Sequence, residues 1–243
     1  MTGRGKNNGF MSEEWYKKRI PIFLEYTIKC LKNQTNRNFT HWISFRAQEK
    51  KHPLTKELLR NLKDYPFIAT FDGQVHFDDR GNNDNLEERL AKSLAYLKER
   101  LWTTDWVYVT YMDSDEVIRN DIVEIIQTEE PEYQKALIHK KGYALNLETR
   151  QLADWSIGSA WSTWTLMYPY EIFFDAKKHL KYLNGWTTHE EIPDKFKCKE
   201  LPENTFITTI HNWNRSSIWR HYHKGKEYYY EAEKNLILKQ FNL

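Results

Sequence analysis

The sequence predicts an α/β fold, with one domain whose second half covers one face of the sheet. In the first half, segments with helical spacing of apolar residues alternate with short runs rich in aromatic and β-branched residues, which is the order of a parallel sheet covered by helices. Residues 106–111, Trp-Val-Tyr-Val-Thr-Tyr, lack clean alternation and so predict a strand buried on both faces in the middle of the sheet. The 243 residues suffice for one domain with a sizeable core.

The composition excludes several classes of protein. The formal net charge is only +2, so the chain lacks the basic field of a nucleic-acid-binding protein. Cys30 and Cys198 lie far apart without a CxxC pair, which argues against a disulfide scaffold or a structural zinc site. No apolar run approaches the roughly 20 residues needed to cross a bilayer, and the first residues do not form a signal peptide. We therefore expect a soluble cytoplasmic protein with no transmembrane segment and no nucleic-acid partner.

The first half predicts three helices and two strands before residue 106. Ser12, followed by two acidic residues, marks the start of a helix that continues to Leu31, and Pro21 either kinks this helix or marks a second start. The segments that follow are a strand over 39–46, a helix over 53–65, a strand over 67–71 and a helix over 86–101. Residues 72–85 are a long polar loop, and loops of this length inside a domain are often functional.

The second half changes character. Strands are expected over 135–139 and 142–147, around a Lys-Lys-Gly turn that is compatible with a hairpin. Residues 154–168 are dense in Trp, Ser and Thr and give no clean period. The remaining expected elements are helices over 120–128, 170–183 and 226–241 and a strand over 206–210.

An acidic cluster follows the 106–111 strand. Asp113 and Asp115 are separated by Ser114, and alternate residues of an extended chain point the same way, so both carboxylates are expected to face one point. Crevices outside the carboxyl ends of strands are where α/β sheets bind ligands. Two carboxylates there repel each other unless a cation lies between them, and hard oxygen ligands suit Mg²⁺ or Mn²⁺. A charged turn before the next helix explains the same residues equally well.

Four stretches, taken in order, resemble the nucleotide-sugar glycosyltransferases with a GT-A fold, most closely the rhamnosyltransferase group of bacteria. No single stretch is specific, and their order carries the resemblance. The stretches are 19–27 leading through Gln34-Thr35 to 38–43, then 113–117 with 119–121, then 141–143 with the strand after it, and finally 210–216.

This resemblance implies one GT-A domain over residues 1–243, a single Rossmann-like domain with a mixed central sheet. Residues 12–128 would form its nucleotide-sugar-binding half, and residues 129–243 its acceptor-side half with the C-terminal helix. GT-A proteins usually open with a β-strand that helps to form the nucleotide pocket, and residues 1–11 contain no convincing strand. We expect either that this first strand is missing or that these residues pair more weakly.

The activity that the resemblance implies is transfer of a hexosyl or rhamnosyl group. The sugar would pass from a nucleotide-sugar donor to a saccharide or other hydroxyl acceptor in polysaccharide biosynthesis, with Mn²⁺ or Mg²⁺ bound. Asp113 and Asp115 match the DxD element, in which the acidic pair meets the ribose and the metal-diphosphate. His211 matches a metal ligand that many GT-A enzymes carry late in the chain, beside the leaving diphosphate. A surface or core histidine whose hydrogen bonds are satisfied explains it equally well. Asn214 and Arg215 would steady phosphate oxygens, since Arg presents a fork of donors.

An inverting transferase also needs a general base near the acceptor hydroxyl. Glu190 is the first candidate because it follows His189 in the expected acceptor-side loop, and Glu191 is the second. A solvated acidic loop before Pro193 explains both residues as well. Asp154 is a weaker third candidate.

Further residues are candidates for donor or acceptor contacts. Arg80 in the polar loop is expected to approach the nucleotide, and Arg89 and Lys92 lie about one turn apart on the next helix, where they could point toward diphosphate. The alternative for the last two is a charged helix face in water. Trp161, one of three clustered tryptophans, would wall the acceptor or sugar site, and packing beneath a loop is the alternative.

Two other functions fit parts of the sequence. Haloacid-dehalogenase phosphohydrolases also carry Asp-x-Asp after a strand, but that motif normally begins the domain, whereas here it lies in the middle of the chain. A degenerate glycosyltransferase-like protein, which binds a sugar or nucleotide without turnover, is the non-enzymatic alternative.

Overall fold

The computed structural model describes residues 12–45, 47–71, 86–101, 103–156, 163–183, 191–212 and 229–243. These residues form a mixed α/β fold with three sheets. The α/β prediction is therefore confirmed at the level of fold class.

The long N-terminal helix has three consecutive parts. They are α1 (Glu13–Ile22), a π-helical segment η1 (Phe23–Ile28) and α2 (Lys29–Lys32). The Ser12 side chain caps α1 by accepting a hydrogen bond from the Trp15 backbone N–H at 3.2 Å, as the sequence predicted. Pro21 lies inside α1, and the wider π-helix begins two residues after it. Because proline has no N–H and its ring crowds the preceding turn, a change of helical pitch at this point is physically reasonable.

The other elements of the first half alternate between helix and strand. The elements are β1 (His41–Ser44), α3 (Ala47–Lys51), α4 (Pro53–Leu62), β2 (Ile68–Phe71) and α5 (Leu86–Lys98). The short helix α3 was not predicted. The polar loop over residues 72–85 lies outside the described residues. Strands β1 and β2 pair in parallel, as this alternation predicted.

The strand β3 (Trp106–Tyr111) does not lie where the sequence placed it. It pairs antiparallel with β8 (Trp164–Pro169), and within the described residues β8 is its only strand neighbour. All six residues of β3 are half-buried. The prediction of a strand buried on both faces was therefore wrong. Tyrosine and tryptophan pack an apolar ring while keeping a polar end near water, so a continuous aromatic run does not require full burial.

The remaining strands in the described part of the chain are β4 (Glu116–Ile118), β5 (Lys135–Ile138), β6 (Lys141–Asn146), β7 (Leu152–Ser156), β9 (Lys197–Glu200) and β10 (Phe206–Ile210). Together with β3 and β8 they form two four-stranded mixed sheets, with the orders β3-β8-β5-β9 and β4-β10-β6-β7. The helices are α6 (Ile122–Thr128), α7 (Tyr170–Phe173), α8 (Ala176–Tyr182), α9 (Ile192–Lys195) and α11 (Glu231–Gln240).

Strands β5 and β6 do not form a hairpin, so that prediction was wrong. Strand β5 pairs with β8 and β9, while β6 pairs with β10 and β7. Nearly all residues of both strands are buried. Strand β5 lies between β8 and β9, whereas β6 lies between β10 and the next strand along the chain, β7. The Lys140-Lys141 connection therefore carries the chain from one sheet to the other instead of folding it back.

Several elements were not predicted. Strands β4, β7, β8 and β9 were missed, and the helix expected over 170–183 is divided into α7 and α8. Asp175 causes this division, because its side chain accepts a hydrogen bond from the Lys178 backbone N–H at 2.9 Å and so starts a new helix. The residues of β8 are almost all buried, so the strand shows no alternation that a sequence pattern could reveal.

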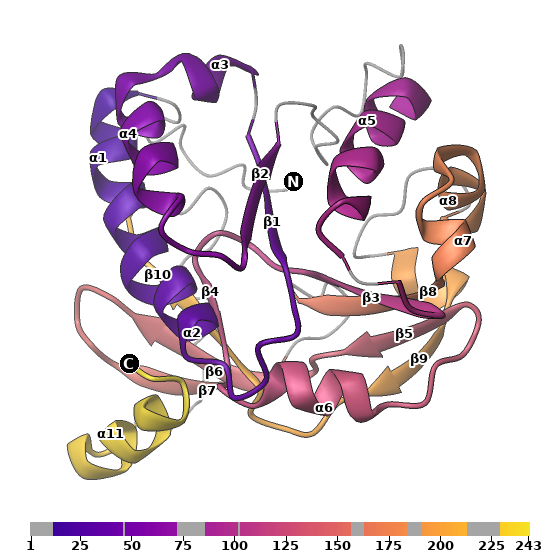
Figure 1. The fold of residues 1–243 in the computed structure, drawn as a ribbon. Coiled ribbons are helices and arrows are strands. Elements are labelled where there is room, and N and C mark those ends of the chain that lie inside the picture. Colours follow the sequence, from indigo (N-terminus) through magenta and orange to yellow (C-terminus); the bar gives the residue numbers. More distant parts are fainter. Residues whose placement is uncertain are drawn as a thin grey trace, which may run out of the picture.

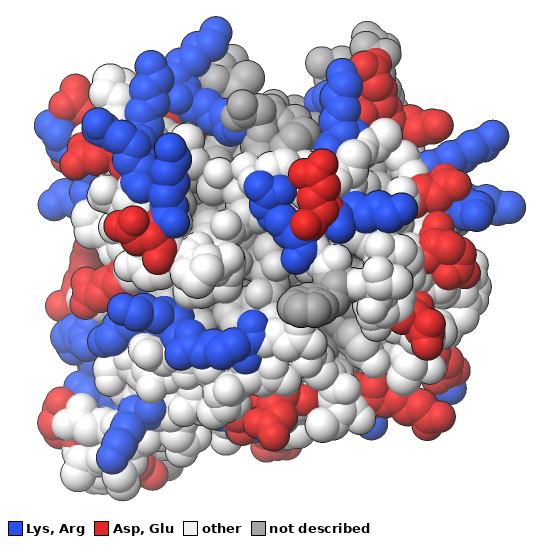
Figure 2. Space-filling view, viewed as in Figure 1, with Lys and Arg blue, Asp and Glu red and all other residues white. Residues whose placement is uncertain are grey.

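Figure 1 shows how the layers are arranged. The two four-stranded sheets lie across the molecule, with α1, α4, α5 and α8 on one side and α6 and α11 on the other. Figure 2 shows that charged side chains of both signs occur over this face, with Lys and Arg most frequent over the helices at the left. Within the described ranges, no helix has the length and apolar character needed to cross a membrane.

Candidate functional site

The residues between β3 and β4 form a tight acidic turn, which we define as residues 113–116. The backbone N–H of Glu116 donates to the carbonyl of Asp113 at 3.1 Å and closes the turn. The two aspartates lie in different environments, because Asp113 is exposed while Asp115 is only 7% exposed. The argument that both side chains share one face of an extended chain was therefore wrong, since this segment bends.

Strand pairing brings a distant histidine to this turn. Strand β10 runs antiparallel to β4 with Thr208 opposite Glu116, so the residues after Thr208 run alongside the residues before Glu116. The Thr209 hydroxyl donates to the carbonyl of Asp115 at 2.7 Å. His211, the first residue after β10, then reaches the side chain of Asp115, with 3.3 Å between His211 Nε2 and Asp115 Oδ2.

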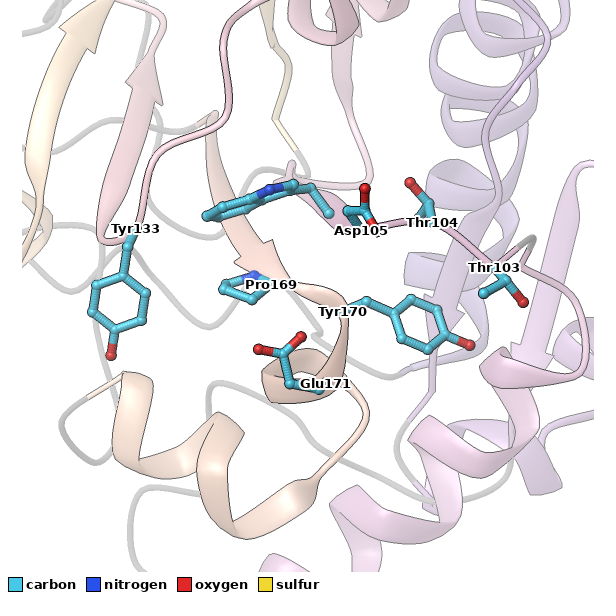
Figure 3. Close-up of a pocket in the computed structure, with 8 residues that line it drawn as sticks. Thr103, Thr104, Asp105, Tyr133, Pro169, Tyr170 and Glu171 are labelled. Atoms are coloured by element: carbon cyan, nitrogen blue, oxygen red, sulfur yellow. The ribbon is translucent and has the colours of Figure 1, made fainter.

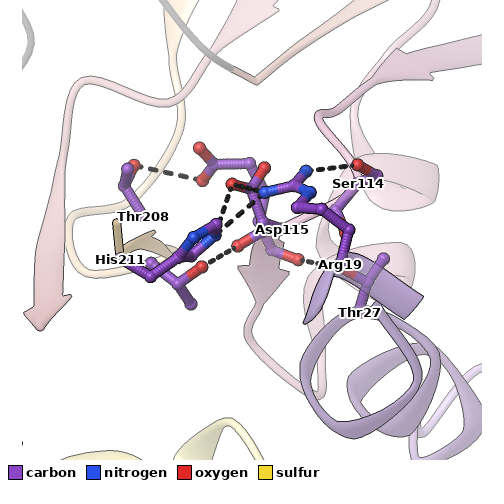
Figure 4. Close-up of polar contacts among 8 residues, drawn as sticks. Arg19, Thr27, Ser114, Asp115, Thr208 and His211 are labelled. Atoms are coloured by element: carbon purple, nitrogen blue, oxygen red, sulfur yellow. Dashed lines mark hydrogen bonds and ion pairs between the residues drawn. The ribbon is translucent and has the colours of Figure 1, made fainter. Parts of the chain in front are cut away.

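The helix α1 contributes an arginine to the same point (Figure 4). Arg19 Nη1 donates to Asp115 Oδ2 at 2.6 Å and lies 2.9 Å from His211 Nε2. Arg19 Nη2 donates to the Ser114 hydroxyl at 2.7 Å. We call Arg19, Ser114, Asp115 and His211 the Arg19 cluster. Three of its four side chains are well buried, at 13% exposure for Arg19, 11% for Asp115 and 3% for His211, while Ser114 is exposed.

The contacts of His211 constrain its tautomer. Nε2 cannot accept a hydrogen bond from Arg19 and donate one to Asp115 at the same time. Because a guanidinium only donates, the 2.9 Å contact with Arg19 requires Nε2 to be the acceptor. Arg19 is then the donor to both Asp115 and His211.

The helix and the turn are joined at a second point. Thr27 lies in η1, and its hydroxyl is 3.0 Å from the carbonyl oxygen of Ser114 and 2.9 Å from that of Glu116. π-Helical segments often occur at functional sites. Here the segment presents Thr27 to the backbone of the acidic turn, so the position of the turn depends on the helix.

The pKa values of the two buried carboxyl groups of the turn, Asp115 and Glu116, are shifted in opposite directions. Burial alone would raise the pKa of Asp115, but the charge of the adjacent Arg19 outweighs burial and holds that pKa well below its usual range. Burial, together with the negative charges of Asp115 and Asp113, raises the pKa of Glu116 well above its usual range. Glu116 accepts a hydrogen bond from the Thr208 hydroxyl at 3.1 Å, which makes it part of the sheet between β4 and β10.

The buried charges of the Arg19 cluster are better explained by a role in binding or catalysis than by a contribution to stability. Removing two charges from water costs several kcal/mol per ion, so a buried ion pair contributes little net stability compared with apolar packing. Strongly shifted carboxyl groups beside a specific charge partner are typical of binding and catalytic sites. With a buried cation next to an exposed hydroxyl at Ser114, the arrangement is suited to holding an anionic group.

The divalent metal that the resemblance implies does not fit the described residues as they are arranged. Among them, no group of three or more His, Cys, Asp or Glu side chains is placed to hold an ion. Asp115 Oδ2 and His211 Nε2, two of the three expected ligands, already contact Arg19 Nη1. An ion could bind both only after Arg19 had moved away, so the expected Mn²⁺ or Mg²⁺ stays a prediction.

The other expected site residues fall into two groups. One group lies outside the described residues and comprises Arg80, Trp161, Glu190, Asn214 and Arg215. Within the described part, Lys92 is exposed on α5 and pairs with Glu88 at 2.6 Å, while Arg89 on the same helix is half-buried. Neither of these two helix residues has a described contact with the Arg19 cluster.

The base candidates on the acceptor side are not brought to the Arg19 cluster by any described contact. Glu191 precedes α9 and pairs with Lys195 at 3.6 Å. Asp154 lies on β7 and accepts a hydrogen bond from the Tyr229 hydroxyl. Because β7 is three strands from β4 in the sheet, the backbone at Asp154 is about 14 Å from β4. Trp164, from the tryptophan cluster, is 2% exposed and stacks on Tyr111, which supports the packing alternative for that residue.

A pocket of about 540 Å³ lies at the other end of β3 (Figure 3). Strand β3 is six residues long, so roughly 20 Å of extended chain separates this pocket from the acidic turn. The pocket is therefore not part of the Arg19 cluster. It is lined by Thr103, Thr104, Asp105, Trp106, Tyr133, Pro169, Tyr170 and Glu171.

Arg19 is the central residue that sequence reasoning did not identify. It is the third of three consecutive basic residues on a helix, and such a run normally faces water. A signal was nevertheless present, because Arg19 opens the first stretch that carries the glycosyltransferase resemblance. Comparison of the sequence with protein-family models gives no match, and comparison with curated proteins gives none either.

Proposed function

We propose that the chain is a glycosyltransferase that moves a sugar from a nucleotide-sugar donor to an acceptor hydroxyl. The observation that carries the proposal is the Arg19 cluster, in which Asp115 from the end of β3 and His211 from the end of β10 meet a buried arginine. These are two of the positions that the resemblance to GT-A enzymes singled out. The cluster also lies just outside the carboxyl ends of two strands, where α/β sheets commonly bind ligands.

The chemistry requires a positive field at the leaving group. The acceptor oxygen forms a bond to the anomeric carbon while the bond from that carbon to the diphosphate oxygen breaks, and the electron pair stays on the diphosphate. The acceptor proton passes to a base, for which Glu190 and Glu191 are the candidates. Preorganised donors aimed at the oxygen that gains charge lower the barrier to such a step. Arg19, held by Ser114 and Asp115, is a donor of this kind.

The first test is thermal melting with a panel of uridine, guanosine and thymidine diphosphates, with and without Mn²⁺. A ligand that binds only the folded chain raises the melting temperature. A rise for one nucleotide, followed by release of that nucleotide from its sugar conjugates, would support the transferase. Binding without turnover would favour the degenerate binding protein, and hydrolysis of simple phosphomonoesters would favour the phosphohydrolase. No rise with any nucleotide would refute the proposal.

The matched variants are Asp115→Asn and Asp175→Asn. Asp115→Asn should lose most transfer activity, because Asp115 holds Arg19 in place. The variant also leaves a buried guanidinium without its counter-ion, which should cost about 3–5 kcal/mol of stability, so its unliganded melting curve must be measured first. Asp175→Asn changes an exposed N-cap of α8 to another good capping residue and should retain activity. Equal activity in both variants would contradict the assignment.

A further inference from the structure

The guanidinium of Arg19 lies where a cation would be needed to bridge Asp115 and His211. Nη1 contacts both of these side chains, and Nη2 contacts Ser114. A guanidinium has five N–H groups, so these three contacts leave Nε–H and one Nη2–H without a hydrogen bond to the described residues. Ser114 is exposed, so the Nη2 end of the group is the end nearest to solvent. The cluster therefore fixes a permanent positive charge and leaves donors available for an incoming ligand.

We propose that Arg19 itself supplies the positive charge that binds the donor's diphosphate, in the place that the family resemblance assigns to a divalent metal ion. This inference rests on the proposed glycosyltransferase function. Arginine is charged at any pH of interest, and its planar fork matches two phosphate oxygens at once. The donor would then bind to the cluster as it stands, and chelation of metal ions would not abolish binding.

The competing possibility is that Arg19 only occupies the site until an ion displaces it. In that case Asp115 and His211 become ligands when Arg19 swings out, and binding of the nucleotide depends on the ion. The two possibilities predict opposite effects of removing Arg19. If Arg19 binds diphosphate, its loss weakens binding, whereas if Arg19 competes with an ion, its loss leaves ion-dependent binding intact or strengthens it.

The experiment is calorimetric titration of the wild-type chain with uridine, guanosine and thymidine diphosphates, in EDTA and in Mn²⁺. The variants are Arg19→Gln, Arg19→Lys and, as the matched control on the same helix, Lys17→Gln, whose exposed charge pairs only with Glu13 among the described residues. We expect wild type to bind one nucleotide in EDTA, Arg19→Gln to bind it at least tenfold more weakly and Arg19→Lys to fall between them. Lys17→Gln should bind like wild type.

Weaker binding must be distinguished from a loss of folded protein, because Arg19→Gln leaves the Asp115 carboxylate buried without a cation and so destabilises the fold. The double variant Arg19→Gln with Asp115→Asn removes both charges, so no buried charge is left without a partner, and it should melt closer to wild type yet still bind weakly. If wild type binds only with Mn²⁺ and Arg19→Gln keeps that binding, the inference is overturned while the proposed function stands. If no nucleotide binds under either condition, the proposed function fails and the inference fails with it.

Discussion

Mild acid should destabilise this fold through two buried histidines. His139 is fully buried between β5 and β6, with Nδ1 2.8 Å from the Thr205 hydroxyl, and burial lowers its pKa to about 3. His179 in α8 is 5% exposed, with Nδ1 3.0 Å from the carbonyl oxygen of Phe173. Burial lowers the pKa of His179 to about 4, although that hydrogen bond opposes the shift. Both side chains therefore remain neutral in the folded chain at pH 5.

The sign and size of the effect follow from proton linkage. The unfolded chain binds these protons near pH 6.5 while the folded chain does not, so stability is complete above pH 6.5 and falls as the pH drops toward the folded pKa values. At about 1.4 kcal/mol for each pH unit, each histidine lowers the free energy of unfolding by about 2 kcal/mol between pH 7 and pH 5. Two such losses are a large part of a typical stability of about 5–15 kcal/mol.

The assay is urea denaturation of wild type and His139→Asn at pH 7 and pH 5. Asparagine does not titrate and can keep the contact with the Thr205 hydroxyl, so the variant should be less stable than wild type at pH 7 by an amount that shrinks by about 2 kcal/mol at pH 5. Leu137→Ala, a fully buried neighbour on β5, is the control, and its deficit of about 2–5 kcal/mol should be equal at both pH values. An unchanged deficit for His139→Asn would refute the reasoning.

Three further predictions test the packing and the site. Gly142→Ala should cost about 1–3 kcal/mol in urea denaturation, because the new Cβ would collide with the backbone carbonyl of Phe206 and lie 2.7 Å from its ring, and an unchanged stability would contradict this packing. Thr27→Val removes the hydroxyl that lies 2.9 and 3.0 Å from two carbonyl oxygens of the acidic turn; it should lose about 1–3 kcal/mol and weaken nucleotide binding, while Thr27→Ser should retain both. Glu190→Gln or Glu191→Gln should spare nucleotide binding in titration but abolish sugar transfer, and full transfer by both variants would move the base elsewhere.

The sequence predicted elements well where a local signal exists. The Ser12 cap, the amphipathic stripe of α4 and strand β10, with its observed bounds of Phe206–Ile210, could all be read from neighbouring residues. Strand partners could not be predicted in this way. The Lys140-Lys141 turn looks like a hairpin turn, but β5 pairs with β8 and β6 pairs with β10, and both of these strands lie further along the chain.

At the candidate site, too, residues with a local sequence signal could be predicted and a residue without one could not. Asp113, Asp115 and His211 were identified because they follow strands and match a family order, and the structure brings Asp115 and His211 together. Arg19 has no local feature that separates it from Lys17 and Lys18 beside it. Its burial depends on which turn of α1 faces the acidic turn, and that orientation is set by packing between segments almost 100 residues apart.

The geometry of the Arg19 cluster depends on strand register more than on any short motif. His211 reaches Asp115 because β10 pairs with β4 so that Thr208 faces Glu116, and a shift of one residue would turn every side chain of β10 to the opposite face. That register is fixed by the fully buried residues of β10, which pack between β4 and β6. A buried charge cluster at the end of such a strand adds desolvation cost without improving the packing of the core. We therefore interpret the cluster as selected for binding an anion, with the sheet acting as the support that keeps its parts in register.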